Sequence, residues 1–121
     1  MEERLVGYDV AKAAKWKFIE FNTRHGFNEP TKEAFDGGNV SNWSLLRKFI
    51  SRPTQSVVQA YLRDNHNLKV YVVPHYDNEH YNSYILNKEV SYNKEHYDLS
   101  FKTYEDALEA GLEEALNLIE N

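Results

Sequence analysis

The sequence predicts an α+β fold in which helices pack on one face of a three-stranded antiparallel sheet. Apolar residues recur at helical spacing over residues 54–66 and 103–119. Between them, residues 68–73, 81–86 and 97–101 form short segments rich in β-branched and aromatic side chains. The predicted order is therefore helix, three strands, helix. This is an αβββα core that an N-terminal helix precedes.

The last predicted helix has the clearest pattern. Thr103 is a typical N-cap residue, and Asp106, three residues later, completes a capping box. The apolar stripe consists of Tyr104, Ala107, Leu108, Gly111, Leu112, Ala115, Leu116 and Ile119. The acids Glu105, Glu109 and Glu113 lie opposite it. We expect the stripe to cover a sheet and these acids to face water.

Three segments have the pattern of strands. Residues 68–73 are rich in valine and stop at Pro74, and residues 81–86 follow a polar turn around Asp77–Asn78. In residues 97–102 apolar and polar side chains alternate, which is the period of a strand with one buried face. The short connections between these three segments favour an antiparallel meander.

We predict a single domain of residues 1–121, in which residues 1–52 form a helical arm and a loop and residues 53–121 form the αβββα core. Asp9 begins an apolar stripe at helical spacing, and Gly26 is placed to end that helix in a left-handed turn. Residues 28–52 mix turn signals with hydrophobic residues, so their conformation stays unassigned.

The composition limits the classes of protein to which the chain can belong. Its 121 residues have room for one hydrophobic core, and 41% hydrophobic and 14% aromatic residues are too many for a disordered chain. The lack of cysteine excludes disulfides and thiolate zinc sites and favours a cytoplasmic location. We find no pattern of a signal peptide or a membrane span, so we expect no membrane partner. The sequence favours no particular oligomeric state.

The net charge of −5 comes from the last part of the chain, where residues 103–121 contain acids and no lysine or arginine. Such a tail repels a phosphate backbone, so nucleic acid is not the expected partner. A nucleic-acid-binding regulator is the alternative. It would use the basic residues near the first helix, Lys12, Lys15, Lys17 and Arg24.

The order of the predicted elements resembles that of the double-stranded-RNA-binding domain, with residues 103–119 similar to its second helix. In that family, lysines at the start of this helix grip phosphates, whereas this chain has Glu105, Asp106 and Glu109 there. Recognition of duplex RNA depends mainly on phosphate and hydroxyl contacts. The resemblance therefore implies the topology and not the RNA binding.

Two motifs support a second resemblance. One combines Pro53–Ser56 with Leu62–Arg63 and His66–Asn67, and the other runs from Thr103 to Leu116. They are similar to a family of small uncharacterised bacterial proteins that recur in phage-like and mobile-element neighbourhoods of anaerobic gut bacteria. The resemblance implies this setting and no established activity. The chain departs from the family pattern between Trp16 and His25.

Histidines and acids gather around the first predicted hairpin, where imidazole and carboxylate groups could bind zinc. They are His75, Asp77, Glu79 and His80, with His96 later in the chain. Their spacing matches no ligand motif, and hairpin turns hold such residues because they are solvated, so we predict no metal and no other cofactor. We also find no nucleophile elbow and no Gly-rich phosphate loop, so we predict no catalytic residue and no enzyme activity.

Aromatic residues provide the candidate binding surface. Tyr71 and Tyr84 lie on predicted strands, where alternation turns some rings away from the helices, and tyrosine is enriched at recognition surfaces. Cross-strand packing is the other interpretation of these tyrosines. Trp43 is either a core or cap residue or an exposed anchor. The candidate binding residues are therefore Trp43, Tyr71, Tyr84, Glu105, Glu109 and Glu113.

These observations together predict a non-enzymatic accessory protein of a phage-like or mobile element that binds another protein. The alternatives are the nucleic-acid-binding regulator and a small enzyme of unknown reaction.

Overall fold

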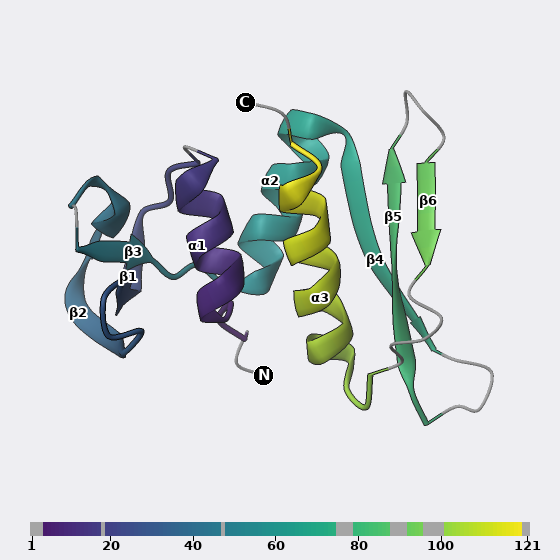
Figure 1. The fold of residues 1–121 in the computed structure, drawn as a ribbon, viewed down its shortest axis with the longest axis horizontal. Helices are drawn as coiled ribbons and strands as arrows, with labels where there is room; N and C mark the ends of the chain where they lie inside the picture. The colour runs from purple at the N-terminus through teal and green to yellow at the C-terminus, as the bar shows by residue number, and fades with distance from the viewer. Residues whose placement is uncertain are drawn as a thin grey trace. The chain divides into compact units, whose positions relative to one another are not determined.

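The structure is a computed structural model that describes residues 4–17, 19–46, 48–74, 79–87, 92–95 and 101–119. Its elements, in chain order, are α1 (Tyr8–Trp16), β1 (Thr23–Asn28), β2 (Ala34–Ser41), the 3-10 turn η1 (Trp43–Leu45), β3 (Phe49–Ser51), α2 (Gln55–His66), β4 (Leu68–Pro74), β5 (Tyr81–Asn87), β6 (Tyr92–Glu95) and α3 (Tyr104–Asn117) (Figure 1). The α+β class is confirmed. The chain divides into two compact units, with the boundary between Thr54 and Gln55.

In the second unit, α2 and α3 lie side by side on one face of the antiparallel sheet β4–β5–β6, as predicted (Figure 1). The register pairs Val70 with Ile85 and Tyr71 with Tyr84. The buried residues that form its core are Val58, Leu62, Leu68, Val70, Ile85, Ala107, Leu108, Leu112, Ala115, Leu116 and Ile119. Burial of this apolar surface is the main source of stability for the unit.

The predicted cap and stripe of α3 are confirmed except at one position. The Thr103 hydroxyl accepts a hydrogen bond of 3.1 Å from the Asp106 N–H. Tyr104, which the pattern placed on the stripe, is 44% exposed. Gly111 lies in the middle of the buried face, where a Cβ atom would come within 2.8 Å of Val70 Cγ1 and 3.0 Å of Ser83 Cβ. A glycine therefore lets the helix approach the sheet closely.

The third strand lies earlier in the chain than predicted. It is β6, which pairs antiparallel with β5, whereas residues 96–100 of the predicted segment lie outside the described residues. Phe101 forms an isolated antiparallel bridge with Tyr81, and each backbone N–H donates to the other residue's carbonyl, with nitrogen-to-oxygen distances of 2.7 and 2.9 Å. The sequence of β6 is Tyr-Asn-Lys-Glu, which has no hydrophobic alternation that could have predicted it.

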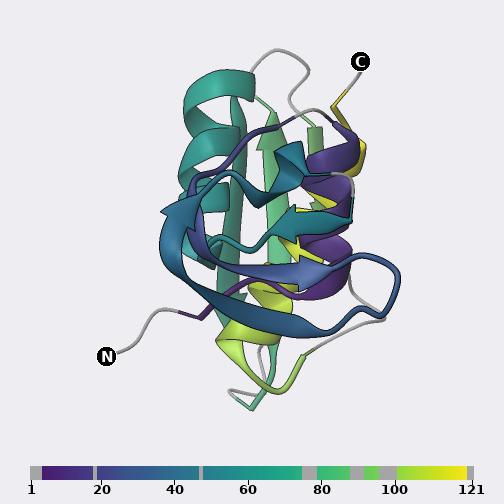
Figure 2. The same cartoon turned by 90° about the vertical axis from the view of Figure 1, so that its left-hand side faces the viewer.

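The first unit contains a second antiparallel sheet, of order β2–β1–β3, within the segment that was predicted as a helical arm and a loop (Figure 2). The prediction that the first helix reaches Gly26 is wrong, because α1 ends at Trp16 and Gly26 lies inside β1. A Cβ atom at Gly26 would stand 2.7 Å from Phe35 Cζ and 2.9 Å from the Ile50 carbonyl oxygen. The glycine therefore serves close strand packing rather than a helix end.

An aromatic cluster of Phe35, Trp43 and Phe49 lies against this sheet. The rings meet edge to face, with centroids 5.2, 5.3 and 6.3 Å apart. The Trp43 indole N–H donates a hydrogen bond of 2.8 Å to the Thr23 carbonyl. A Cβ atom at Gly37 would overlap the Trp43 ring. Trp43 is therefore held by ring contacts and by its polar atom together.

In the part of the chain that the structure describes, no helix is long and apolar enough to cross a membrane.

Candidate functional site

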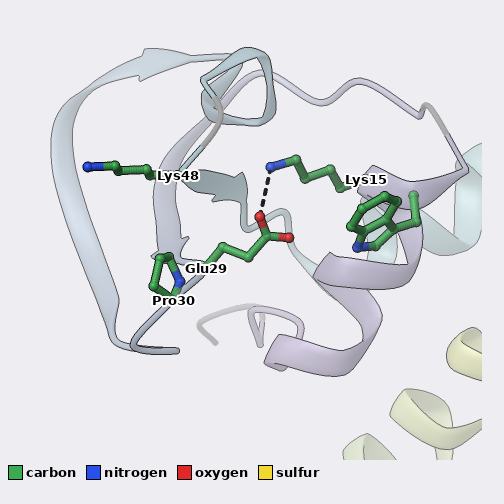
Figure 3. Close-up of a pocket in the computed structure, with 5 residues that line it drawn as sticks. Lys15, Glu29, Pro30 and Lys48 are labelled. Atoms are coloured by element: carbon green, nitrogen blue, oxygen red, sulfur yellow. Dashed lines mark hydrogen bonds and ion pairs between the residues drawn. The ribbon is translucent and has the colours of Figure 1, made fainter.

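An ion pair in the first unit joins α1 to Glu29, the residue that directly follows β1. Lys15 Nζ stands 3.3 Å from Glu29 Oε2, and the two side chains are only 18% and 23% exposed (Figure 3). The Lys15 ammonium also donates a hydrogen bond of 3.1 Å to the Phe49 carbonyl. Lys15 is therefore occupied by partners within its own unit.

The backbone of Glu29 is held on both sides. Its N–H donates to the Lys48 carbonyl at 2.8 Å, and its own carbonyl accepts a hydrogen bond from the Tyr8 hydroxyl at 3.2 Å. These bonds fix the point from which the Glu29 side chain extends. Pro30 follows directly, and its ring restricts the conformation of Glu29 further.

The two carboxylate oxygens of Glu29 differ sharply. Oε2 faces the Lys15 ammonium, whereas Oε1 is buried and has no hydrogen-bond partner among the described residues. A buried acceptor without a donor is costly, and a carboxylate oxygen is a stronger acceptor than a neutral one. The arrangement therefore leaves one acceptor of the carboxylate unsatisfied.

Glu29 lines a pocket of about 560 Å³. Its other lining residues are Lys15, Trp16, Pro30 and Lys48. Figure 3 shows the Lys48 side chain extending away from the Glu29 carboxylate. Trp16 is 61% exposed, although it is one of the largest apolar side chains. The volume lies in the range of pockets that hold small molecules.

A second pocket, of about 220 Å³, also contains Lys15. Its other lining residues are Ile19, Glu20, Asn42, Ser44 and Leu45. Leu45 is 72% exposed. We call the two cavities the Lys15 pockets. The first unit thus has a hollowed surface whose walls include exposed apolar side chains.

Tyr71 and Tyr84, both predicted as binding residues, lie together in the second unit. They are cross-strand partners on β4 and β5, and their rings stack with centroids 5.5 Å apart and an angle of 13°. Val70 and Ile85, their neighbours along the strands, are buried beside α3. Because side chains alternate, the tyrosine pair lies on the face away from the helices.

Trp43, the third aromatic candidate, lies in the first unit and belongs to the aromatic cluster described above. It is partly buried, and the structure supports the interpretation as a core or cap residue more than that as an exposed anchor.

The predicted acidic face of α3 is less open than expected. Glu105, Glu109 and Glu113 are all partly buried. The Gln55 side-chain amide donates to the Glu105 carbonyl at 2.9 Å and to Glu109 Oε1 at 3.0 Å. Because Gln55 itself is buried, Glu109 satisfies a polar group inside the unit. Its role here is to join α2 to α3.

Of the basic residues proposed for nucleic-acid binding, two have acidic partners. Lys15 pairs with Glu29, and Arg24 Nε lies 2.8 Å from Asp36 Oδ1. The hydrogen bond from Arg24, together with one from the Gly38 N–H, holds the pKa of Asp36 below its ordinary value. The same contact raises the pKa of Arg24.

The described residues contain no group of three His, Cys, Asp or Glu side chains that could hold a metal ion. Of the cluster considered in the sequence, His75, Asp77 and His96 lie outside the described residues, while Glu79 is exposed and His80 partly buried.

The sequence did not indicate the pairing of Lys15 with Glu29. The two residues are fourteen positions apart, and the strand β1 lies between them. Pro30 signals a turn at this point of the chain, but such a signal does not show which groups the neighbouring side chains contact.

No protein-family model matches this chain, no curated protein is significantly similar to it, and no solved structure matches its fold significantly.

Proposed function

We propose that this chain is a non-enzymatic, cytoplasmic accessory protein of a phage-like or mobile element, and that it binds another protein through the Lys15 pockets. The observation that supports the proposal is the pair of adjoining cavities with exposed apolar walls. Trp16 and Leu45, which line one cavity each, are 61% and 72% exposed. Large exposed apolar side chains beside a cavity are typical of interaction sites.

The arrangement suits a protein segment better than a nucleic acid. Two cavities that share Lys15 as a lining residue can take two side chains of one polypeptide segment. A phosphate backbone would instead have to compete with acidic side chains for two of the four basic residues considered above. Lys15 and Arg24 already pair with Glu29 and Asp36. Net charge and geometry thus favour the same partner class.

The test is selection of peptides from a displayed random library on the folded protein. We expect peptides that bind the wild type at least about tenfold more tightly than the double variant Trp16→Ala/Leu45→Ser. Both residues are largely exposed, so the double variant should fold, which circular dichroism verifies.

The matched control is Val40→Ser. Val40 is 69% exposed in the same unit and lines neither of the Lys15 pockets. The Val40→Ser substitution also removes an exposed apolar side chain, and it should leave peptide binding unchanged. The proposal fails if the selected peptides bind the double variant as well as the wild type, or if the library yields no binder while a DNA or RNA oligonucleotide is retarded in a gel at low salt.

A further inference from the structure

We propose that the larger Lys15 pocket binds a tryptophan or tyrosine side chain of an acidic partner segment, and that the ring's N–H or O–H donates to Glu29 Oε1. This inference rests on the proposed function and specifies the chemistry of the partner. It follows from the unused acceptor, the charges around it and the apolar walls.

The first step is the need for a donor. Glu29 Oε1 is buried and has no hydrogen-bond partner among the residues the structure describes. The Glu29 backbone is held by Tyr8 and Lys48, so the side chain extends from a fixed point beside the pocket that it lines. A ligand that supplies a donor at this point removes the cost of the unsatisfied oxygen.

The second step is that the donor should be neutral. The Lys15 ammonium, 3.3 Å from Oε2, already balances the charge of Glu29. A cationic ligand would place a second positive charge next to Lys15, in a pocket that Lys48 also lines. Like charges at such distances repel. A backbone amide, an indole N–H or a phenol O–H avoids this repulsion.

The third step concerns the body of the ligand. Trp16 and Pro30 provide ring surfaces in the pocket, and the stems of Lys15 and Lys48 are aliphatic. An aromatic ring packs well against such walls, and Trp and Tyr combine an apolar body with a polar tip. The volume of about 560 Å³ accommodates either side chain.

The fourth step is the charge of the flanking residues. Lys48 is exposed at the pocket. The ammonium groups of Lys12 and Lys32 lie 5.9 and 5.3 Å from the centre of the Tyr8 ring, whose hydroxyl bonds to the Glu29 carbonyl. Lys48 thus lies at the pocket itself, and Lys12 and Lys32 lie over a tyrosine that is hydrogen-bonded to the Glu29 backbone. Acidic residues on both sides of the inserted ring complement this field.

The experiment uses three synthetic, end-capped pentapeptides and isothermal titration calorimetry with the full chain. The sequences are Asp-Asp-Trp-Glu-Glu, Asp-Asp-Phe-Glu-Glu and Lys-Lys-Trp-Lys-Lys. We expect the first to bind, with NMR shift changes at Trp16 and Glu29. The phenylalanine peptide lacks the donor and should bind at least about tenfold more weakly. The basic peptide should also bind at least about tenfold more weakly than the first peptide.

Two protein variants separate the contributions. Lys48→Glu, a surface change, should weaken the acidic tryptophan peptide by about tenfold and leave the basic peptide unchanged or tighter. The double variant Lys15→Met/Glu29→Leu removes the acceptor without leaving a buried unpaired charge. In this variant the tryptophan and phenylalanine peptides should bind equally. If it fails to fold, the wild-type comparison of the two peptides decides the same point.

Several results would overturn the inference. Equal affinity of the tryptophan and phenylalanine peptides for the wild type would show that no hydrogen bond from the ring to Glu29 contributes to binding. Tighter binding of the basic peptide would show that the site does not prefer acidic flanking residues. Self-association that Trp16→Ala abolishes would assign the pocket to a second copy of the chain. If library peptides depend on the Lys15 pockets but are basic or lack Trp and Tyr, this inference fails while the proposed function stands.

Discussion

The two units use aromatic rings differently. In the first unit, Phe35, Trp43 and Phe49 meet edge to face beside a sheet whose strand β3 has only three residues. In the second unit, Tyr71 and Tyr84 stack on the outer face of a sheet whose other face is covered by two helices. The second sheet buries long aliphatic residues under α2 and α3. The first sheet has a bulge in β2, where Thr23 pairs with Ser41 but His25 with Asp36.

The comparison indicates that aromatic residues have different roles in the two sheets. Where strands are short or interrupted, few ladder hydrogen bonds are available, and ring packing holds the strands together. Where helices cover a regular sheet, the rings on its other face add little to stability. Aromatic content alone therefore does not identify a binding surface. Three predictions test the difference between the two groups of rings, and a fourth tests an exposed ion pair of β2.

The largest effect is expected for Trp43→Ala. It removes ring contacts with Phe35 and Phe49 and the hydrogen bond to Thr23, so the free energy of unfolding should fall by about 3 kcal/mol. Trp43→Phe keeps part of the packing and should cost less. Urea denaturation followed by circular dichroism measures both. An unchanged midpoint for the alanine variant would mean that the cluster does not hold this unit together.

The next effect is expected for Gly37→Ala. A Cβ atom at this position overlaps the Trp43 ring, so the substitution should cost about 1–3 kcal/mol of unfolding free energy by overpacking. The matched measurement is a double-mutant cycle with Trp43→Leu, which makes room for the methyl group. The cost of Gly37→Ala should shrink in that background. An undiminished cost would trace the effect to the backbone at Gly37 instead.

The same contrast explains how far the sequence could predict the fold. The second unit could be predicted because its core follows the two regular periods, with Leu108 and Leu112 on one helical face and Val70 beside them on a strand. The Thr103 cap is also a local signal. β6 was misplaced because its residues are polar, and pairing with β5 rather than pattern defines it.

The first unit was harder because its stabilising contacts join residues far apart in the sequence. Gly26 has the same appearance at a helix end and inside a strand, and only the approach of Phe35 and Ile50 distinguishes the two. The candidate site could not be predicted for the same reason. Lys15 and Glu29 are ordinary surface residues until folding brings them to 3.3 Å.

A small effect is expected for Tyr71→Ala. Tyr71 is 38% exposed, and its main ring contact is the stack on Tyr84, so the loss should be about 1 kcal/mol or less. Tyr71→Phe keeps the stack and should be nearly neutral. Urea denaturation under the conditions used for Trp43→Ala gives the comparison. A loss as large as that of Trp43→Ala would show that the outer tyrosines are structural as well.

The smallest effect is expected for Asp36→Asn on the exposed part of β2, and it should depend on pH. Arg24 and the Gly38 N–H lower the pKa of Asp36 in the folded chain, so its ionised form favours folding. This contribution is fully present above the unfolded pKa of about 4 and disappears as the pH falls through the lower folded pKa. The wild type should therefore be slightly more stable than Asp36→Asn at neutral pH and equal to it in acid.

Urea midpoints at several pH values measure this difference in stability, and added salt should narrow it because the Arg24–Asp36 pair is exposed. A difference in stability that stays constant with pH would show that the charge of Asp36 does not contribute to folding. The aromatic cluster would then remain as the tested source of stability for β2.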